Sequence, residues 1–538
     1  MSPEILPTHA GRGGERAWVV ALLATFAALC GLKIAMMLRA TGGTFVYSLD
    51  DAYIHLSVAE NIARGHYGVN ATEFSAPSSS ILWPFLLAPF TPFAFATYVP
   101  LVSALVTSAG CVVFFHRIAS DALGRPTDLA RQALAAICAL LLIPLTNLIG
   151  LTVNGMEHSL QLLLTASAIS GLMREGEDGK LPRWLVPVLV LGPLIRYENL
   201  AVSIPGLAIV WLRGHRRGAV QGAAALAVVG LLFTLRLVVN GAGVLPVSVQ
   251  AKLGLASGEG FGPALERMFT NLRSRQGAIL GIGALAAAMV AVDARLPTTQ
   301  RLVAGLGATV GALHLAAGRF GWLGRYEIYA VAAVTLVLLA HFLRRIDAGG
   351  WKTTLTRSAV LGCGTILVGQ PNFTVPIRSI VGARENYEIH FQVRDFVVNR
   401  YQGSIAVCDL GIMSYRNPSY VLDFGGLANR EVQEARRVSE RTGTAAYMAD
   451  LADRYGVRLA IIFPEWFPSL PEHWRKVAEL RLNGGRFARP EKTLGFYATD
   501  AETEARVLPM LRDFATTLKG RNQLVVSATP GDSLPASR

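Results

Sequence analysis

Charged residues are scarce in this chain of 538 residues, because Asp, Glu, Lys and Arg together make up 16% of it, whereas an ordinary soluble protein carries about 25%. Cysteine is rarer still, and five cysteines in such a length cannot build a disulfide framework. Hydrophobic residues account for 52% of the chain, and they gather in runs near the ~20 residues that cross a bilayer. These features exclude a soluble globular enzyme and indicate a polytopic membrane protein.

The apolar runs predict about eleven membrane helices in an all-α membrane domain. The first, Trp18–Leu38, is too long for the apolar core of a cleaved signal peptide and has no small-residue cleavage site after it. We expect it to remain as the first span, after a cytoplasmic N-terminus of residues 1–17. The other predicted spans are Thr97–His116, Ala130–Leu151, His158–Met173, Trp184–Ile195, Asn199–Leu212, Ala219–Val239, Gly277–Val292, Leu302–Ala317, Tyr326–Leu343 and Thr354–Val368.

The positive charges support this topology and make a nucleic-acid partner unnecessary. The net charge is +13, and most Lys and Arg residues punctuate the apolar runs. With the N-terminus inside, the cytoplasmic loops are the basic ones, as the positive-inside rule requires. An odd number of spans then places the C-terminal region outside. The basic residues of the predicted inner loops are Arg117, Arg125, Arg174, Lys180, Arg183, Arg213, Arg216, Arg217, Arg295, Arg344, Arg345 and Lys352.

Two regions of the chain are expected outside the membrane. Within the transmembrane domain of residues 18–370, the external loop 40–96 contains an apolar stretch that three prolines interrupt, which favours in-plane or re-entrant helices. Residues 371–520 predict an extracytoplasmic α/β domain, and residues 521–538, rich in Ser, Pro and Gly, predict a disordered tail. The predicted elements of the domain are strands near Ser404–Cys408, Tyr420–Asp423, Leu459–Phe463 and Leu494–Ala498, a helix Arg430–Tyr455 and a last helix after the fourth strand.

Two adjacent carboxylates, Asp50 and Asp51, follow the first span on the outer side. A carboxylate accepts a proton from a hydroxyl well when partial burial and a like-charged neighbour raise its pKa. A solvated loop would also carry this pair at little cost. A base at the membrane surface would suit a substrate that has a lipid tail.

The segments Asp50–Ile54, Ala59–Asn70 and Ser78–Trp83 resemble the first external loop of bacterial GT-C membrane glycosyltransferases. The nearest relatives in this resemblance are the mycobacterial terminal arabinofuranosyltransferases, which use polyprenyl-phosphate arabinose. The resemblance implies that an aspartate, Asp50 with Asp51 as helper, is the base of an inverting transfer from a polyprenyl-phosphate sugar. We expect the neighbouring side chains to contact substrate, namely Tyr53, His55 and Asn61.

Three further acidic and basic positions match the family pattern on the predicted outer side. Glu157 follows Gly155 and Met156, and it is a candidate substrate contact, although it would equally keep a helix end hydrated. Arg196 and Glu198 flank Tyr197, where the family commonly has a proline. An Arg and a Glu at membrane depth are costly unless they pair or face a cavity. The two residues are therefore candidates for phosphate and substrate binding, with a mutual structural ion pair as the alternative.

Two more cations are candidates for binding the donor phosphate. Pro246, Ser248 and Lys252 resemble a family stretch of the form Pro-Asn-Thr-x-x-x-Lys, and a lysine can neutralise a leaving phosphate as a point charge. Arg325 lies near the outer start of the tenth span, where an arginine could hold phosphate bidentately. The rival interpretations are a solvated loop lysine and an arginine that reaches lipid headgroups.

Metal binding and acceptor binding have weaker signals. His55 and His66 lie near the aspartate pair and could help to hold a divalent metal, but no tight ligand spacing supports a metal site. We therefore expect no required cofactor. Asp409 and Asp423 each precede a glycine near a predicted strand end, as in paired family motifs, and acceptor binding there is a hypothesis. Turn formation explains the same residues without a ligand.

Together these features predict an inverting glycosyltransferase in the bacterial inner membrane. Its partners would be a polyprenyl-phosphate sugar and an envelope glycan or lipid acceptor on the outer face. A transporter or flippase of lipid-linked sugars is the alternative, although the sequence has no repeated halves of the kind such proteins show. A third possible function is that of a structural envelope-assembly protein whose active site has decayed. The sugar, the acceptor, the metal dependence and the oligomeric state are left open by the sequence.

Overall fold

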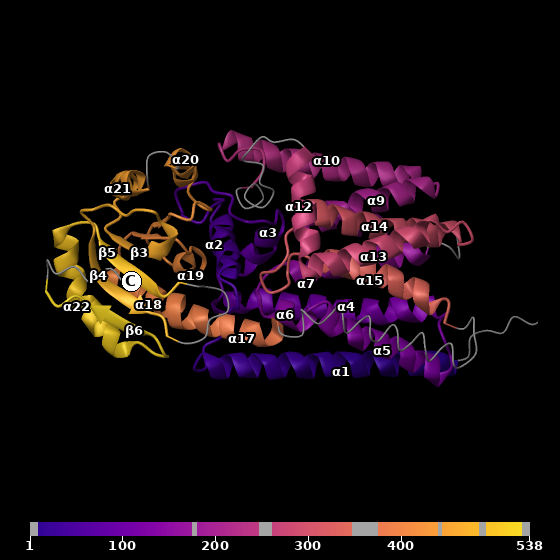
Figure 1. The fold of residues 1–538 in the computed structure, drawn as a ribbon. Helices are drawn as coiled ribbons and strands as arrows, with labels where there is room; N and C mark the ends of the chain where they lie inside the picture. Colours follow the sequence, from indigo (N-terminus) through magenta and orange to yellow (C-terminus); the bar gives the residue numbers. More distant parts are fainter. Residues whose placement is uncertain are drawn as a thin grey trace, which may run out of the picture.

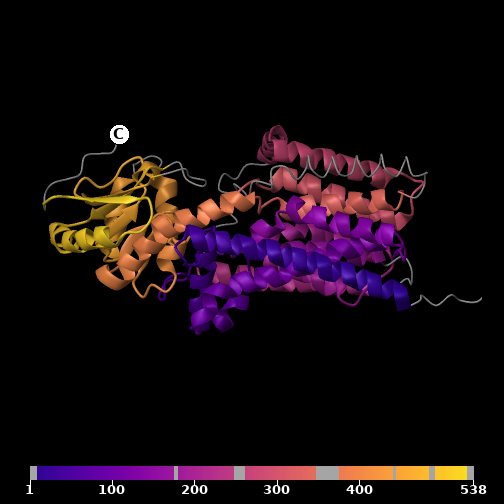
Figure 2. The same ribbon diagram turned by 90° about the horizontal axis from the view of Figure 1, so that it is seen from below.

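The computed structural model describes residues 9–174, 180–246, 261–346, 375–439, 444–483 and 491–529. This described part consists of a bundle of long helices and a smaller α/β domain, which lie end to end (Figure 1). The helix α17 (Val375–Asn386) packs against the first helix of the bundle and leads into the domain, as both views of the ribbon show (Figure 2).

Each predicted span that the structure describes lies on helix, and one of them is divided into two helices. The eleventh, Thr354–Val368, lies outside the described residues, so the number of eleven spans stays a prediction. One helix that the sequence did not predict, α12, runs across the others in Figure 1. The helices of the bundle are α1 (His9–Ala40), α4 (Val99–Ala122), α5 (Leu129–Leu145), α6 (Leu148–Thr152), α7 (His158–Arg174), α8 (Leu185–Ile195), α9 (Leu200–Leu212), α10 (Arg216–Val239), α12 (Phe261–Arg273), α13 (Arg275–Val292), α14 (Thr298–Ala317) and α15 (Ile328–Leu343).

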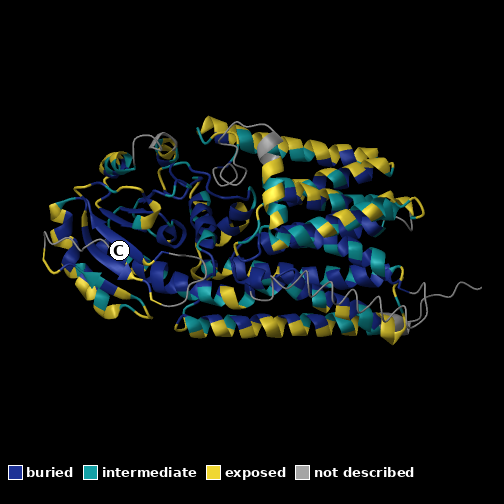
Figure 3. Cartoon of the chain, viewed as in Figure 1, coloured by how far each residue is buried: buried dark blue, intermediate teal, exposed yellow. Residues whose placement is uncertain are grey.

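Several of these helices present apolar side chains to their surroundings. In the described part, four are long and apolar enough to cross a membrane: Gly14–Ala40, Ala94–Ala122, Arg216–Val239 and Arg275–Val292. The outward faces of α1 and α10 are widely exposed in Figure 3 and include Val20, Leu32 and Leu231. Apolar surface of this extent marks contact with lipid or a partner. The chain is thus a multi-pass membrane protein with an α/β region near its C-terminus.

The predicted span Ala130–Leu151 is two helices, α5 and α6. Pro144 near the end of α5 has no N–H to donate, and Asn147 between the helices adopts a left-handed conformation with φ 48°. The amide of Asn147 donates to the carbonyl of Leu323 at 2.7 Å. The break therefore contacts a turn of the chain that is distant in sequence.

The external loop folds into short helices between the bundle and the domain. Its first half contains α2 (Asp51–Ala63), and its apolar half contains α3 (Trp83–Leu87) and the 3-10 turns η1 (Ala88–Phe90) and η2 (Ala94–Tyr98). Helices this short agree with the expectation that the prolines prevent a full span. The inner face of α2 is buried, so the loop is a structural layer between the two larger parts.

The α/β domain is built on a six-stranded mixed sheet in the order β2-β1-β3-β5-β4-β6. The strands β1, β2 and β3 are parallel and wholly buried, as their apolar composition requires, and β5, β4 and β6 follow with antiparallel pairing. The helix α22 (Ala501–Thr517) packs against β4, β5 and β6. The strands are β1 (Ile405–Val407), β2 (Val421–Asp423), β3 (Leu459–Ile462), β4 (Arg475–Arg481), β5 (Thr493–Ala498) and β6 (Gln523–Val526).

Three sequence expectations for this domain need correction. The single helix predicted over Arg430–Tyr455 is two helices, α20 (Arg430–Ser439) and α21 (Ala445–Arg454), separated by a stretch rich in poor helix formers. The strand β4 was missed because its charged residues obscure the alternation of apolar and polar residues that is typical of a strand. The buried carboxylate of Glu479 pairs with Lys476 at 2.5 Å and with Arg481 at 2.7 Å. The predicted tail begins too early, since β6 pairs with β4.

Candidate functional site

A cavity of about 440 Å³ lies where the bundle, the external loop and the α/β domain meet. Each of the three parts contributes charged side chains to its wall, so the site exists only in the folded chain. The described residues that line it are Ser48, Leu49, Asp50, Asp51, Ile54, Trp322, Arg325, Tyr326, Gly382, Glu385, Asn386, Cys408, Asp409, Leu410, Leu427, Trp466 and Glu491.

The carboxylate of Asp50 joins the external loop to the α/β domain. Its Oδ2 accepts the backbone N–H of Gly411 at 2.7 Å, and its Oδ1 accepts that of Ile412 at 2.8 Å. Gly411 is required by this approach, because a Cβ atom there would lie 2.1 Å from the carbonyl oxygen of Asp50. Both oxygens of Asp50 are thus engaged by the domain, which does not support the preference for Asp50 over Asp51 as the base.

Asp51, the second carboxylate of the pair, forms an ion pair with Arg325. Its side chain is 45% exposed, and its Oδ1 lies 3.2 Å from Nη2 of Arg325, whose side chain is only 3% exposed. Arg325 also donates from Nη2 to the hydroxyl of Tyr326 at 3.1 Å. Its Nε and Nη1 are buried and have no hydrogen-bond acceptor within the described part of the chain. A buried guanidinium that keeps unused donors is suited to bind an anion in the cavity.

The turn that presents Arg325 has a strained backbone. Four consecutive residues, from Gly321 to Gly324, have positive φ angles, and two of them are Trp322 (46°) and Leu323 (63°). Each such non-glycine residue costs of order 1–3 kcal/mol, and strain of this kind clusters at functional sites. The turn is held by the bond from Asn147 to Leu323 and by the N–H of Gly321, which donates to Glu327 at 3.1 Å.

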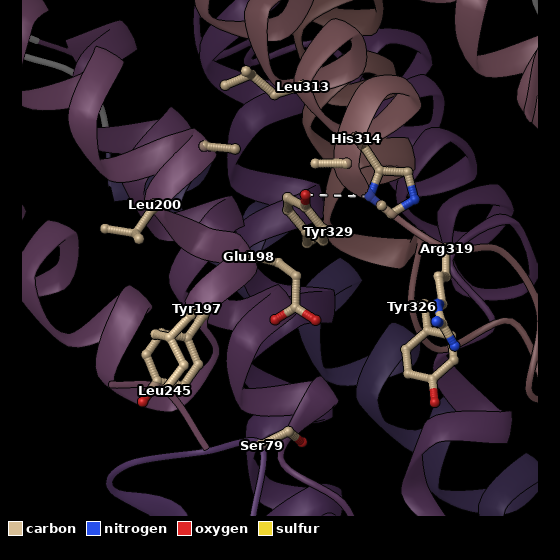
Figure 4. A pocket seen from close by; sticks show the side chains of 13 residues that line it. Ser79, Tyr197, Glu198, Leu200, Leu245, Leu313, His314, Arg319, Tyr326 and Tyr329 are labelled. Carbon is tan, nitrogen blue, oxygen red and sulfur yellow. Dashed lines mark hydrogen bonds between the residues drawn. The ribbon is translucent and has the colours of Figure 1, made fainter. Parts of the chain in front are cut away.

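A second cavity, of about 390 Å³, opens among the membrane helices next to the first. Figure 4 shows its side chains: Tyr326 and Arg319 lie across it from Tyr197 and Leu245, and Glu198 lies between them. Most of its wall is apolar, with residues from α9 and α14. Tyr326 lines both cavities, so the apolar space and the charged space adjoin at this residue.

Arg196 is fully buried and is shared by two glutamates. Its Nη1 donates to Glu157 at 2.8 Å and to Ser79 at 2.7 Å, and its Nε and Nη2 donate to the two carboxylate oxygens of Glu198 at 3.1 and 2.5 Å. With its donors committed to carboxylates, Arg196 is poorly placed to bind a phosphate. The geometry favours the structural ion pair over the predicted phosphate contact. Of its partners, Glu198 and Ser79 line the apolar cavity.

His55 extends this network from the external loop. Its Nε2 lies 3.6 Å from Glu157, and its Nδ1 lies 3.1 Å from the hydroxyl of Ser78. Burial lowers the pKa of His55, although the carboxylates of Glu157 and Asp51 oppose this shift. Burial alone would raise the pKa of Glu157, but His55 and Arg196 outweigh it and hold that pKa below its usual range.

Gly155 explains how Glu157 reaches this position. It has φ 69°, and a Cβ atom there would lie 2.6 Å from Ala52 and 2.7 Å from the ring of Tyr47. Only a glycine allows α2 to approach the chain so closely. The Gly155-Met156-Glu157 pattern that the sequence singled out is therefore a packing requirement of the external loop, which places Glu157 beside His55.

Tyr53 and Asn61 have structural parts instead of the predicted substrate contacts. The hydroxyl of Tyr53 accepts the backbone N–H of Tyr47 at 3.2 Å within a buried aromatic cluster. The amide of Asn61 donates to the carbonyls of Gly68 and Val69 at 3.0 and 2.7 Å. Both side chains are buried, and neither lines the two cavities described above.

The two aspartates of the domain motifs behave differently. Asp409 lines the charged cavity, and its Oδ2 lies 3.3 Å from Nε2 of His390, which lies on a π-helical turn. Asp423 is buried, and its carboxylate accepts the backbone N–H groups of Gly425, Leu427 and Ala428. Burial raises the pKa of Asp423 to about 6, against the effect of these N–H groups. Asp423 thus shapes the turn that carries Leu427, as the alternative of turn formation predicts.

The remaining candidates are Lys252 and the metal-binding histidines. Lys252 lies outside the described residues, so its predicted role at the phosphate stays a prediction. His66 does not join His55, because its Nε2 lies 2.7 Å from the carbonyl of Glu73. Within the described ranges, no three His, Cys, Asp or Glu side chains converge as metal ligands would. The need for a metal stays untested.

The sequence missed five residues of the charged cavity. These come from segments far apart in the chain, and each is an ordinary polar or aromatic residue of a loop or helix end. One Trp follows a glycine and one Glu follows a proline, whereas the other three have neither neighbour, so no sequence signal marks them as a site. They are Trp322, Glu385, Asn386, Trp466 and Glu491.

Comparison with known proteins covers both parts of the chain. Residues 377–501 match a family model described as a domain of unknown function (DUF8728). No curated protein matches the sequence. The structure is similar to ArnT from Cupriavidus metallidurans, which was solved bound to undecaprenyl phosphate. That similarity has 10% identity and a TM-score of 0.49, over 90% of this chain and 98% of the other.

A second similar structure is the oligosaccharyltransferase of Archaeoglobus fulgidus in its apo form. It shares 12% identity with this chain at a TM-score of 0.49, over 90% of this chain and 74% of the other. Since both TM-scores are below 0.5, the function of this chain must rest on the geometry of its own site.

Proposed function

We propose that this protein is an inverting glycosyltransferase of the GT-C kind. It would move a sugar from a polyprenyl-phosphate donor to an envelope glycan or lipid on the outer face of the inner membrane. The observation that carries the proposal is the meeting of two cavities at Tyr326, one apolar and one charged. A ligand with a charged head beside Arg325 and an apolar tail among the helices fits this arrangement.

In this proposal Arg325 binds the donor phosphate. Its Nε and Nη1 are the buried donors without an acceptor in the described part of the chain, and they lie beside the cavity. Negative charge grows on the phosphate oxygens as the bond to the sugar breaks. A cation already held in place by the strained turn stabilises that charge without reorganising, which is the largest contribution that such a site offers.

Asp51 is the general base in this proposal. The acceptor hydroxyl gives its proton to Asp51 as its oxygen forms a bond to the anomeric carbon, and the bond from that carbon to the phosphate oxygen breaks. The electron pair of the broken bond leaves with the polyprenyl phosphate, and the configuration at the anomeric carbon is inverted. Asp51 is suited to this role because it is half exposed in the cavity, whereas the oxygens of Asp50 are engaged by Gly411 and Ile412.

The identity of the sugar comes from the sequence resemblance, which points to arabinofuranose. The walls described here do not distinguish a pentose from a hexose. We therefore propose arabinofuranosyl transfer as the first donor to test, with hexosyl and uronyl donors as the comparison.

The test is transfer by the purified protein in nanodiscs, with a panel of polyprenyl-phosphate sugars and an envelope extract as acceptor. We expect one donor to be consumed by the wild type, no detectable consumption with Asp51→Asn, and partial activity with Asp50→Asn. Equal activity of the wild type and Asp51→Asn would refute the assigned base. Tight donor binding without turnover by the wild type would favour the flippase instead.

A further inference from the structure

The charged cavity is markedly acidic beyond the groups that the proposed reaction uses. Glu385 on α17, Asp409 after β1 and Glu491 before β5 line it together with the two aspartates of the external loop. Among the described lining residues, Arg325 is the one Lys or Arg. Among its described lining residues, the wall contributed by the α/β domain therefore presents carboxylates and no lysine or arginine to a bound molecule.

Glu491 has an unused acceptor in this wall. Its side chain is nine-tenths buried, and its Oε1 accepts the indole N–H of Trp466 at 2.6 Å. Its Oε2 is buried and has no hydrogen-bond donor within the described part of the chain. A buried carboxylate oxygen without a donor costs free energy, about 1–3 kcal/mol, that a ligand hydroxyl in the cavity would recover.

Two tryptophans border the same cavity. Trp322 comes from the strained turn and Trp466 from the 3-10 turn η7 (Pro464–Trp466), and both indoles are substantially exposed. A flat indole beside hydrogen-bonding carboxylates offers an apolar face and polar partners together. A sugar ring has the same two features, with C–H groups on its faces and hydroxyls at its edge.

Resting on the proposed glycosyl transfer, we propose that this cavity selects an acceptor whose terminal sugars are uncharged. Glu491, Asp409 and Glu385 accept hydrogen bonds from its hydroxyls, and Trp466 and Trp322 contact its faces. Arg325 is occupied by the donor phosphate. A phosphate or carboxylate on the acceptor sugar would then face like charge, with no lysine or arginine among the described lining residues left to compensate it, which rejects such acceptors.

The test compares matched pairs of oligosaccharides that differ only in charge. Galacto-, gluco- and manno-oligosaccharides and their counterparts oxidised to uronates are titrated against the full-length protein in nanodiscs that contain polyprenyl phosphate, which occupies Arg325 as the proposal requires. Binding is followed calorimetrically. We expect at least one neutral series to bind tenfold or more tightly than its uronate counterpart. With Glu491→Gln, the ratio of uronate Kd to neutral Kd falls to about threefold or less, because the substitution removes the charge of the side chain and keeps its shape.

A second variant and a control keep the test decisive. Asp409→Asn removes a charge from another part of the wall and should also lower the ratio of uronate Kd to neutral Kd. The test therefore does not depend on the correct folding of a single variant. Glu502→Gln removes a charge from the exposed first turn of α22 and leaves the ratio unchanged. Equal binding of uronates, a ratio unchanged in both cavity variants, or no binding of any series would overturn the proposal.

Parallel transfer assays separate this proposal from the proposed function. A protein that prefers neutral oligosaccharides but transfers no sugar from any donor would refute the transferase and leave the charge selection standing. A protein that transfers sugar equally well to neutral and uronate acceptors would refute the charge selection alone.

Discussion

Asp50 and Gly411 are 361 positions apart in the chain, yet the carboxylate of one accepts the backbone N–H of the other at 2.7 Å. This bond and its neighbour at Ile412 fix the external loop against the α/β domain. The same contact sets the edge of the charged cavity, because Asp50 and Leu410 both line it. The adjacent aspartates therefore divide two tasks, with Asp50 positioning the domain and Asp51 facing the cavity.

The first prediction concerns this division of tasks. Asp50→Asn replaces one acceptor oxygen by an N–H₂ group that faces a backbone N–H, so it should weaken the docking of the domain by about 1–3 kcal/mol. We expect faster hydrogen exchange at the amides of Gly411 and Ile412 and a partial loss of transfer. Asp51→Asn should abolish transfer and leave that exchange unchanged, and the reverse pattern would contradict the assignment.

The second prediction concerns Arg325. Arg325→Met should lower kcat by about 10²–10³, the effect of losing one pre-placed charge-stabilising group. Arg325→Lys should recover only part of this, because an ammonium group lacks the planar fork of a guanidinium. Steady-state kinetics with the consumed donor provide the measurement. Arg295→Met, at an arginine that is 94% exposed and lines neither cavity, is the control, and an equal effect of both variants would count against a special role for Arg325.

The third prediction concerns the buried network around Arg196. Arg196→Met leaves Glu157 buried without its main cation and should destabilise the protein by about 3–5 kcal/mol. The double variant Arg196→Met with Glu157→Gln should recover part of that loss, since the unpaired carboxylate that remains, Glu198, is 25% exposed and not fully buried. The measurement is the apparent melting temperature in detergent. If the double variant were less stable than Arg196→Met, the network would not act as a structural ion pair.

The fourth prediction concerns pH. Because burial raises the pKa of Asp423 to about 6 from an ordinary value of 3.8, the folded state holds its proton more tightly than the unfolded state between these pH values. The contribution of Asp423 to stability therefore falls as the pH rises from about 4 to 6 and stays at its lower value above that. Asp423→Asn should remove this dependence. Melting curves of the wild type and of Asp423→Asn between pH 4 and 7 test this prediction. If the melting temperatures of the two proteins changed in parallel with pH, Asp423 would not be the source of the pH dependence.

Local sequence patterns were sufficient for most helices of the bundle, although they missed α12 and the break between α5 and α6. Runs such as Ala219–Val239 have a length and composition that only a membrane helix satisfies, and α10 (Arg216–Val239) follows them closely. The buried strands β1 and β3 were also predicted, because apolar runs between turn signals need no tertiary context. The strand β4 was not, since its charges are paired with each other and with α22, as in the bond from Arg475 to Glu504 at 2.7 Å.

The sequence by itself therefore determined the membrane class, most of the helices, the external loop and its pair of aspartates, because composition and periodicity act over a few neighbouring residues. Only the tertiary structure decided how the charges are used. It paired Arg196 with two glutamates, left Arg325 with unused donors, engaged Asp50 with Gly411 and brought Trp466 and Glu491 to the cavity. The energetic contribution of a charged side chain depends on its burial and on partners that are distant in the chain, and a local sequence pattern contains neither.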